Sequence, residues 1–378
     1  MPANDRFEFR IPFKTLLIGV CLTAVPISVA ALYSILQSDR SLERTIGHHF
    51  HLIAAGTASE IRHVIQDRVV DVGKLTIAPD VVAAVETSNR SYQGMSEQAI
   101  SDRISRIDGI WDTPEADPIV NRMLASPASR LLLQHKARDP SLLRITVTDE
   151  KGATVAASHK TLDYYQADED YWQDIYAKGR GSVSVSDVKY DDVTHSYYVG
   201  VGVPILEEGT TRVIGTLDAL VDLSKLFPVV SRSRIGQTGR TLLIKDDGTI
   251  IAAPDADLAM KARAIEAGAA TEAINDPEGL RTGYVVTDLP GVRRTLIGFA
   301  DVGLRTELPK LEWLVLVSQS TREAFAPIRV VGRLIAFVSV VSLGLVVLLI
   351  VYFTLHRREE FTEIGEIQPR EPETVKQA

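Results

Sequence analysis

Cysteine is almost absent from this chain, because Cys21 is the only one among 378 residues. An intramolecular disulfide is therefore excluded, and the folded part must be stabilised by its hydrophobic core. Positive charge is also scarce, since 41 Lys and Arg residues stand against 49 Asp and Glu residues, for a formal charge of −8. This balance argues against nucleic-acid binding, which needs a basic face.

Catalytic motifs are lacking as well. The sequence contains no G-x-S-x-G, no H-E-x-x-H and no phosphate-binding loop. His48 and His51 would share a helical face, but no acidic partner stands at the spacing that a metal site needs. We therefore expect no enzyme activity, no metal and no cofactor.

Two long runs without charge are present, one near each end of the chain. Residues 15–36 (TLLIGVCLTAVPISVAALYSIL) and 334–355 (LIAFVSVVSLGLVVLLIVYFTL) contain no Asp, Glu, Lys or Arg. A helix of either run is roughly 33 Å long and matches a hydrocarbon core of about 30 Å, so both runs are predicted to be transmembrane helices. A signal peptide is the alternative for the first run, because residues 28–30 (SVA) resemble a cleavage site. Its apolar run exceeds the roughly 7–15 residues typical of a signal peptide, which favours an uncleaved anchor.

Basic residues flank both predicted spans on the sides that face the chain ends. Arg10 and Lys14 precede the first span, and Arg357 follows the second. By the positive-inside rule, residues 1–14 and 356–378 lie in the cytoplasm and residues 37–333 lie outside it. The polar residues 356–378 cannot bury a core. We therefore expect the chain to lack an effector domain and to signal through a separate effector protein or through a homodimer.

The segment after the first span has the pattern of helices. Residues 37–71 carry apolar side chains at helical spacing and are predicted to form one long helix. Shorter helices are expected at residues 79–86, 97–107 and 118–133. Residues 37–142 are therefore predicted to form a helical stalk with additional helices.

From residue 143 onward the pattern is that of strands, and one hairpin occurs twice. Residues 144–158 (RITVTDEKGATVAAS) and 241–254 (TLLIKDDGTIIAAP) each have an aliphatic run, an acidic turn with Gly, and a second run that reaches Ala-Ala. Gly152 and Gly248 occupy the same place and supply the positive φ that a tight turn requires. The repeat predicts two similar modules.

Each hairpin is followed by further segments with the pattern of strands. An antiparallel sheet with helices on one side, built twice, gives an α+β fold. The first module is predicted over residues 143–226 and the second over residues 227–328. The additional strand segments are residues 182–190, 195–206, 211–223, 279–288, 295–302 and 313–320.

The two spans, the long helix, the repeated hairpin and the closing segment LEWLVLVSQSTREAFAPI together resemble the double Cache sensor domain family. The resemblance covers roughly residues 37–328. Members of this family are the extracytoplasmic ligand-binding parts of bacterial chemoreceptors, histidine kinases and cyclases, and their modules are PAS-like. The resemblance implies a small-molecule sensor in the bacterial inner membrane. It also implies a ligand pocket in the membrane-distal module, under the loop and short helix that follow the first hairpin.

That loop and helix, residues 163–176 (DYYQADEDYWQDIY), depart from the amino-acid-binding pattern of the family. Tyr165 and Trp172 match the pattern, whereas Asp170 stands where the family has Arg and Gln173 stands where it has a second Tyr. An acid at the Arg position would repel a ligand carboxylate. Recognition of a free α-amino acid by this pattern is therefore not expected.

Aromatic and acidic residues are concentrated in this segment and in the strands that follow it. Aromatic walls with carboxylates suit a cationic or amine-bearing ligand, through cation–π attraction and charge-assisted hydrogen bonds. Asp218 is expected on the same strand face as Leu220, which occupies the usual Asp position of the family. The predicted ligand-binding residues are Tyr165, Asp168, Asp170, Tyr171, Trp172, Tyr190, Asp192, Tyr198 and Asp218.

Less specific interpretations remain open. The aromatic side chains could cover a sheet with their polar tips toward water, and the acids could form a solvated face. For the whole protein, a structural or scaffolding membrane protein with empty Cache modules is the alternative to a sensor. An exported hydrolase is a third interpretation.

Overall fold

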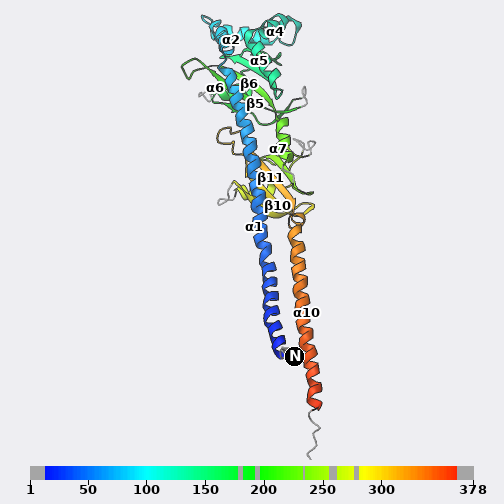
Figure 1. Ribbon diagram of the computed structural model, residues 1–378. Coiled ribbons are helices and arrows are strands. Elements are labelled where there is room, and N and C mark those ends of the chain that lie inside the picture. The colour runs from blue at the N-terminus through cyan, green and yellow to red at the C-terminus, as the bar shows by residue number, and fades with distance from the viewer. Residues whose placement is uncertain are drawn as a thin grey trace, which may run out of the picture. The chain divides into compact units, whose positions relative to one another are not determined.

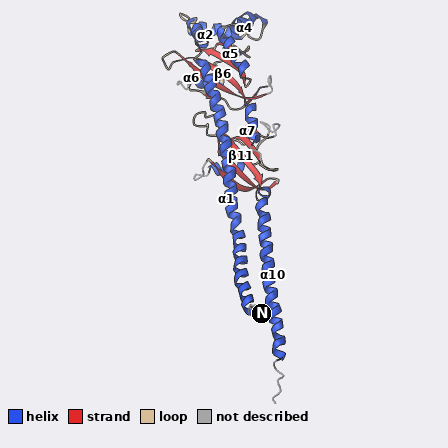
Figure 2. Ribbon diagram, viewed as in Figure 1, coloured by secondary structure: helices blue, strands red, loops and turns tan. Residues whose placement is uncertain are grey.

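The computed structural model describes residues 13–177, 182–191, 196–232, 235–254, 262–275 and 281–363. The chain divides into two compact units, one of Ile46–Glu323 and one of Met1–Thr45 with Ala324–Ala378. Helices and strands are labelled in Figure 1 and coloured by type in Figure 2.

The longest element is helix α1 (Phe13–Thr76), which contains the predicted long helix and continues beyond it. From Ile46 onward it belongs to the larger unit, where Phe50, Ala54, Ile61 and Ile65 are buried at intervals of three to four residues or their multiples. One hydrophobic core contains these side chains together with residues of both sheets. In Figure 1 this part of α1 runs first beside β10 and β11 and then beside β5 and β6.

A group of short helices follows α1. Their bounds are α2 (Pro79–Arg90), α3 (Glu97–Asp108), the 3-10 helix η1 (Pro114–Ala116), α4 (Asp117–Leu124) and α5 (Pro127–Arg138). The single helix expected at residues 118–133 is therefore two helices. Ser126 accepts a hydrogen bond from the backbone N–H of Ser129 and caps α5, and Pro127 cannot donate a helical hydrogen bond back into α4.

The first sheet is antiparallel, with strand order β2-β1-β6-β5-β3, and β4 also pairs with β5. The single strand expected at residues 182–190 is two short strands. Ser186 accepts a hydrogen bond from Gly200 N–H through its hydroxyl, and Asp187 bonds its own neighbour Val188, so side chains interrupt the ladder. The strands are β1 (Leu142–Asp149), β2 (Thr154–Ala157), β3 (Ser184–Val185), β4 (Lys189–Asp191), β5 (Ser196–Leu206) and β6 (Val213–Asp222).

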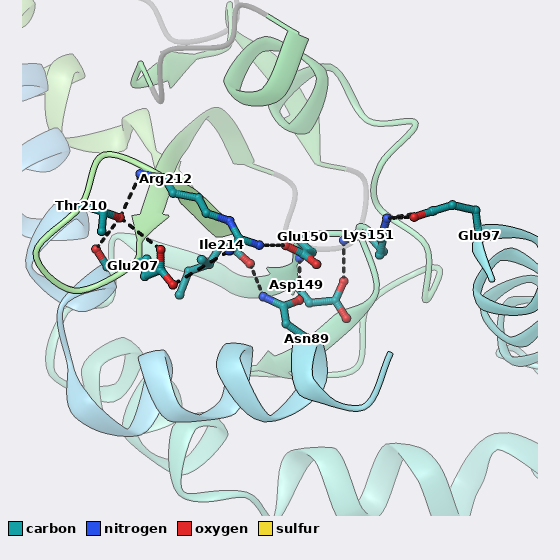
Figure 3. Close-up of polar contacts among 9 residues, drawn as sticks. All are labelled: Asn89, Glu97, Asp149, Glu150, Lys151, Glu207, Thr210, Arg212 and Ile214. Carbon is teal, nitrogen blue, oxygen red and sulfur yellow. Dashed lines mark hydrogen bonds and ion pairs between the residues drawn. The ribbon is translucent and has the colours of Figure 1, made fainter. Parts of the chain in front are cut away.

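Helix α2 is held to the first sheet by Asn89, near its C-terminal end. The Asn89 side chain donates to the carbonyl of Ile214 on β6 at 2.7 Å and accepts from the backbone N–H of Glu150 in the hairpin turn at 3.2 Å. Asp149 accepts from the backbone N–H of Lys151 in the same turn at 2.9 Å. Figure 3 shows these contacts, which fix the hairpin turn and β6 to one helix.

The second sheet has the order β8-β7-β11-β10-β9 and is also antiparallel. Its strands are β7 (Arg240–Lys245), β8 (Ile250–Ala252), β9 (Thr282–Leu289), β10 (Val292–Asp301) and β11 (Trp313–Ser320). The remaining helices of this unit are α6 (Asp170–Ala177), η2 (Leu223–Lys225), α7 (Leu226–Arg232), α8 (Ala267–Asn275) and most of α9 (Thr321–Ala324).

The two sheets confirm the internal repeat and the α+β fold. The order β2-β1-β6-β5 of the first sheet recurs as β8-β7-β11-β10 in the second. Gly152 and Gly248 both have a positive φ, of 81° and 86°, in the two hairpin turns. The turn chemistry predicted from the sequence is therefore present in both modules.

The smaller unit contains the first part of α1 and helix α10 (Ala326–Glu363). Among the described residues, one helical stretch is long and apolar enough to cross a membrane, Gly332–Tyr352, which overlaps the second predicted span. The first predicted span, residues 15–36, lies in α1, and its apolar stretch within the described part is the shorter Ile18–Ala31. The second of the two flanking spans thus has support from length and composition, whereas the first remains a prediction.

Gly298 on β10 allows α1 to approach the second sheet closely. A Cβ atom at this position would lie 2.5 Å from the backbone carbon and oxygen of Phe50 on α1. Neither backbone atom can move without displacing the helix.

We expect Gly298→Ala to lower the free energy of unfolding by about 1–3 kcal/mol, because it overpacks the contact between α1 and the second sheet. The matched control is Gly268→Ala in α8, where an added Cβ meets no atom within 4 Å. The control should be neutral or slightly stabilising, since Ala is the better helix former. Tryptophan fluorescence during thermal unfolding measures both variants, and equal midpoints would contradict the close approach.

Candidate functional site

A cavity of about 180 Å³ lies on the first sheet, under the loop and helix that follow the first hairpin. Strands β1, β5 and β6 supply Arg144, Gly200 and Asp218 to its wall. The opposite side is formed by the loop that contains Asp163 and by Tyr171 on α6. This position is the one that the resemblance to the double Cache family implies for a ligand pocket.

Asp218 is the most deeply buried acid of the cavity, with 6% of its surface exposed. Its Oδ1 atom is buried and has no hydrogen-bond partner among the described residues. Burial raises the pKa of Asp218 to about 7, the charge of Arg144 lowers it, and Glu169 raises it further. A buried carboxyl group without a partner is costly, so this site is suited to a ligand that supplies a hydrogen-bond donor.

Arg144 brings a positive charge into the same cavity. In the β1–β6 ladder, Arg144 stands opposite Leu220 and Thr146 stands opposite Asp218. Because residues two apart on a strand share a face, Arg144 and Asp218 both face the cavity. The Nε atom of Arg144 is buried and lacks a hydrogen-bond partner in the described part of the chain. The cavity therefore contains an unpartnered acceptor and an unpartnered donor.

Helix α6 closes the cavity by packing directly onto β5. A Cβ at Gly202 would meet both Tyr171 and Ile175 of α6 at 3.2 Å, so the glycine makes room for this helix. The Tyr171 hydroxyl donates to the Gln166 side chain at 3.2 Å. Burial, followed by the nearby charge of Asp218, raises the pKa of Tyr171 well above its usual value, which keeps the phenol neutral.

The loop before α6 adds a second acid with an altered pKa. Burial raises the pKa of Asp163 to about 6, and the charges of Glu169, Asp168 and Asp108 raise it as well. The carboxylate of Asp163 accepts a hydrogen bond from the Gln166 side chain. The cavity is therefore lined by charges of both signs, since Arg144, Lys189 and Lys310 stand in its wall together with the acids.

The second module also contributes to this cavity. Lys310, from the segment between β10 and β11, lines it and forms an ion pair with Asp174 of α6 at 2.6 Å. Asp174 also accepts a hydrogen bond from the Ser184 hydroxyl at 2.7 Å. A second ion pair between the modules joins Lys245, at the end of β7, to Asp187 at 2.6 Å. The cavity is thus complete only when both modules are present.

Four of the predicted ligand-binding residues line this cavity: Asp170, Tyr171, Tyr198 and Asp218. Four others do not line it: Tyr165, Asp168, Trp172 and Tyr190. Asp192 lies outside the described residues.

The start of α6 at Asp170 determines which of the predicted residues on this helix line the cavity and which do not. Tyr171 and Ile175, four residues apart, face the sheet. Trp172 and Tyr176 lie on another face of the helix, where their rings stack with their centroids 4.2 Å apart. The expected aromatic wall is therefore reduced to Tyr171 and Tyr198.

Several cavity residues were not predicted from the sequence. They are Arg144, Thr161, Leu162, Asp163, Gln166, Glu169, Ser184, Ser186, Lys189, Gly200, Leu220 and Lys310. Among the described residues, no group of three or more His, Cys, Asp or Glu side chains could hold a metal ion. The sequence repeat could have pointed to Arg144 as a site residue, because an arginine stands eight residues before the glycine of each hairpin.

A family model described as Cache domain matches residues 38–328 of this chain, and no curated protein sequence matches it. Matching solved structures include the ligand-binding domain of the Pseudomonas aeruginosa PAO1 amino acid chemoreceptor PctC in complex with GABA. That match has 16% identity and a TM-score of 0.47, and it covers 72% of this chain and 99% of the other. The Pseudomonas fluorescens chemoreceptor CtaA domain with L-leucine matches at 14% identity and a TM-score of 0.46, over 76% and 99% of the two chains. At such identities and TM-scores, the ligands of these receptors are not transferred to this chain.

We expect Asp218→Asn to stabilise the protein at pH 8 by an amount on the order of a few kcal/mol. The carboxyl group is protonated in the folded state up to about pH 7, whereas in the unfolded state it ionises above its ordinary pKa of 3.8. The folded state therefore holds the extra proton between these values, and this residue's contribution to stability falls as pH rises through that window. The benefit of the substitution should be absent near pH 3, grow toward pH 7 and then level off.

Thermal unfolding of both proteins between pH 3 and 8 measures this difference. Asp168→Asn is the matched control, because Asp168 is exposed and lies off the cavity. A difference between the Asp218 variant and the parent protein that does not change with pH would contradict the altered pKa.

Proposed function

This chain belongs to the Cache domain family, and on that basis we propose that it is a sensor that binds a small polar molecule in the cavity of its first module. The observation that carries this proposal is the burial of Asp218 Oδ1 and Arg144 Nε in one cavity without partners among the described residues. A structural core would pair such atoms or replace them by apolar groups. A binding site leaves them for the ligand.

The chemistry of the cavity favours a ligand with a hydrogen-bond donor or an amine. Asp218 supplies the acceptor at the base of the cavity, and Tyr171 and Tyr198 supply two aromatic rings. A cation near such rings gains about 0.5–2 kcal/mol. Support for an amine therefore comes mainly from Asp218 and less from the aromatic residues than the sequence predicts.

We propose that the chain performs no catalysis of its own. Support comes from the described residues that line the cavity, because none of them is a His or a Cys, the side chains that most often act as base or nucleophile near pH 7. Turnover of an ester, amide or phosphoester by the purified chain would contradict it. The effector protein and the homodimer expected from the sequence stay predictions.

We expect small amines to raise the unfolding temperature of the full chain in detergent micelles, and Gly200→Val to abolish that increase. A Cβ at Gly200 would lie 3.3 Å from Asp218 Oδ1 and 3.7 Å from Leu220, so the larger side chain fills the cavity. A ligand at ten times its Kd stabilises a protein by about 1.4 kcal/mol. Asp168→Ala, outside the cavity, is the control and should retain the full increase.

Two results bear on the alternatives. An increase that survives in Gly200→Val would place binding elsewhere. If amines, organic acids and nucleobases all leave the unfolding temperature of the parent protein unchanged, the scaffolding interpretation is favoured over the sensor.

We also propose that the larger unit lies outside the cytoplasmic membrane of a bacterium, with the chain crossing the membrane twice. Support comes from the apolar helix Gly332–Tyr352, in which side chains such as Leu334, Phe337 and Leu348 are exposed. An apolar surface of this kind is stable in lipid and unfavourable in water. Family members are extracytoplasmic sensors, which agrees with this placement.

Reporter fusions test the topology. A periplasmic reporter inserted after Val199 should be active, and the same reporter fused after Ala378 should be inactive, because the two sites lie on opposite sides of the membrane. A cytoplasmic reporter at both sites provides the reciprocal control. Equal activity of one reporter at the two sites would exclude a two-pass arrangement with an exterior sensor.

A further inference from the structure

The two modules carry an arginine at the same structural position. Arg144 and Arg240 each lie on the first hairpin strand, eight residues before the turn glycines Gly152 and Gly248. Each also faces the equivalent strand of its sheet, with Arg144 opposite Leu220 on β6 and Arg240 opposite Ser318 on β11. The surroundings of Arg144 in the first module correspond to those of Arg240 in the second.

In the second module this arginine has a carboxylate partner. Arg240 donates from Nε and from one terminal nitrogen to the two oxygens of Glu266, at 2.8 and 2.9 Å. The Ser318 hydroxyl donates to Glu266 at 2.7 Å. Glu266 is only 1% exposed, so the pair is a buried two-pronged contact of the kind that guanidinium groups make with carboxylates.

In the first module the equivalent partners are missing from the described residues. Glu169 matches Glu266 in its place at the start of a helix, since its carbonyl accepts the first helical hydrogen bond of α6 just as the carbonyl of Glu266 does for α8. Glu169 is exposed, however, and no hydrogen bond or ion pair joins it to Arg144 in the part of the chain that the structure describes. Leu220 replaces Ser318 and removes the hydroxyl donor.

Asp218 does not take the role of the missing carboxylate. It lies opposite Thr146, two positions along the β1–β6 ladder from Arg144. It forms no ion pair with Arg144 in the described structure. Its own Oδ1 atom remains without a partner there, so the two groups do not satisfy each other. Arg144 Nε therefore needs an acceptor that the described part of the chain does not supply.

We propose that Arg144 binds a carboxylate group of the ligand, so that the first module takes from solution the group that the second module carries internally as Glu266. This inference rests on the proposed function, and it specifies the ligand as a small organic acid. Asp218, beyond Arg144 on the same sheet face, accepts a hydrogen bond from a donor elsewhere in the same molecule. The anionic group thus binds the first strand of the module rather than α6, where Asp170 would repel it.

Acetate is a suitable probe, because it presents the carboxylate alone. Acetamide has the same shape without the charge, and sodium chloride matches the ionic strength. All three tryptophans, Trp111, Trp172 and Trp313, lie in the larger unit, so their fluorescence follows its unfolding in the full chain in detergent. At tenfold excess over its Kd, acetate should raise the unfolding temperature by roughly 2–5 °C, whereas acetamide and chloride should not.

Arg144→Gln should lose this response, and Arg144→Lys should lose most of it, because lysine keeps the charge but not the two-pronged geometry. Arg212→Gln is the control: Arg212 is an exposed arginine of the same module that pairs with Glu150 outside the cavity. It should respond to acetate as the parent protein does. The lysine variant provides the decisive comparison if the glutamine variant does not fold.

Either of two results would overturn this inference. One is an acetate response no larger than that of acetamide in the parent protein, and the other is an equal acetate response in the parent protein and both Arg144 variants. If amines still stabilise the parent protein and not Gly200→Val in the same assay, the sensor function holds and only the carboxylate contact fails.

Discussion

Both modules depend on the packing of one helix, α1, against two separate sheets. The two sheets share no strand and no strand pairing within the described residues, so each alone would leave an apolar face in water. Residues from Phe50 to Leu75 cover these faces and belong to the same core as β-strand residues such as Val147 and Val315. A helix shared in this way makes the modules a single folding unit, and it requires close contact at a few points such as Gly298.

The two modules share one strand order but differ in the polar residues at matching positions. The second module has Arg240, Glu266 and Ser318 in mutual contact and thus encloses its own ion pair. The first module retains the arginine but has an exposed glutamate and a leucine at the other two positions. Breaking one half of a buried ion pair is costly in a purely structural site. The retention of a cavity there indicates that the missing half is supplied from outside.

The fold was predictable because its determinants are local in the sequence. Turn glycines, alternating strands and the helical spacing of α1 each act over a few residues, and the structure confirms them. The split between α4 and α5 was missed although Ser126 and Pro127 form a typical helix start, with Ser as the N-cap and Pro at the first helical position. The site was less predictable because the register of α6 decides which side chains face inward, and one residue of shift would exchange Tyr171 for Trp172. The sequence around Lys310 could not predict that this residue lines the cavity, since it reaches the cavity from the other module.

Lys310 also connects the second module directly to the helix that covers the cavity, through its ion pair with Asp174. Asp174, its partner, lies on α6, the helix that closes over the site, so any displacement of α6 must carry Lys310 along or break the ion pair. The pair is partly exposed, with 41% of the Lys310 side chain accessible, and pairs of this kind contribute only about 0–1 kcal/mol. Breaking it is therefore within reach of the binding energy of a small ligand. A further ion pair between the modules joins Lys245, at the end of β7, to Asp187, which lies between the short strands β3 and β4. The modules are thus joined near the cavity by charged contacts, of which the Lys310–Asp174 pair is weak, and along α1 by a large apolar contact, so the Lys310–Asp174 pair is the one that a ligand can rearrange while the core remains intact.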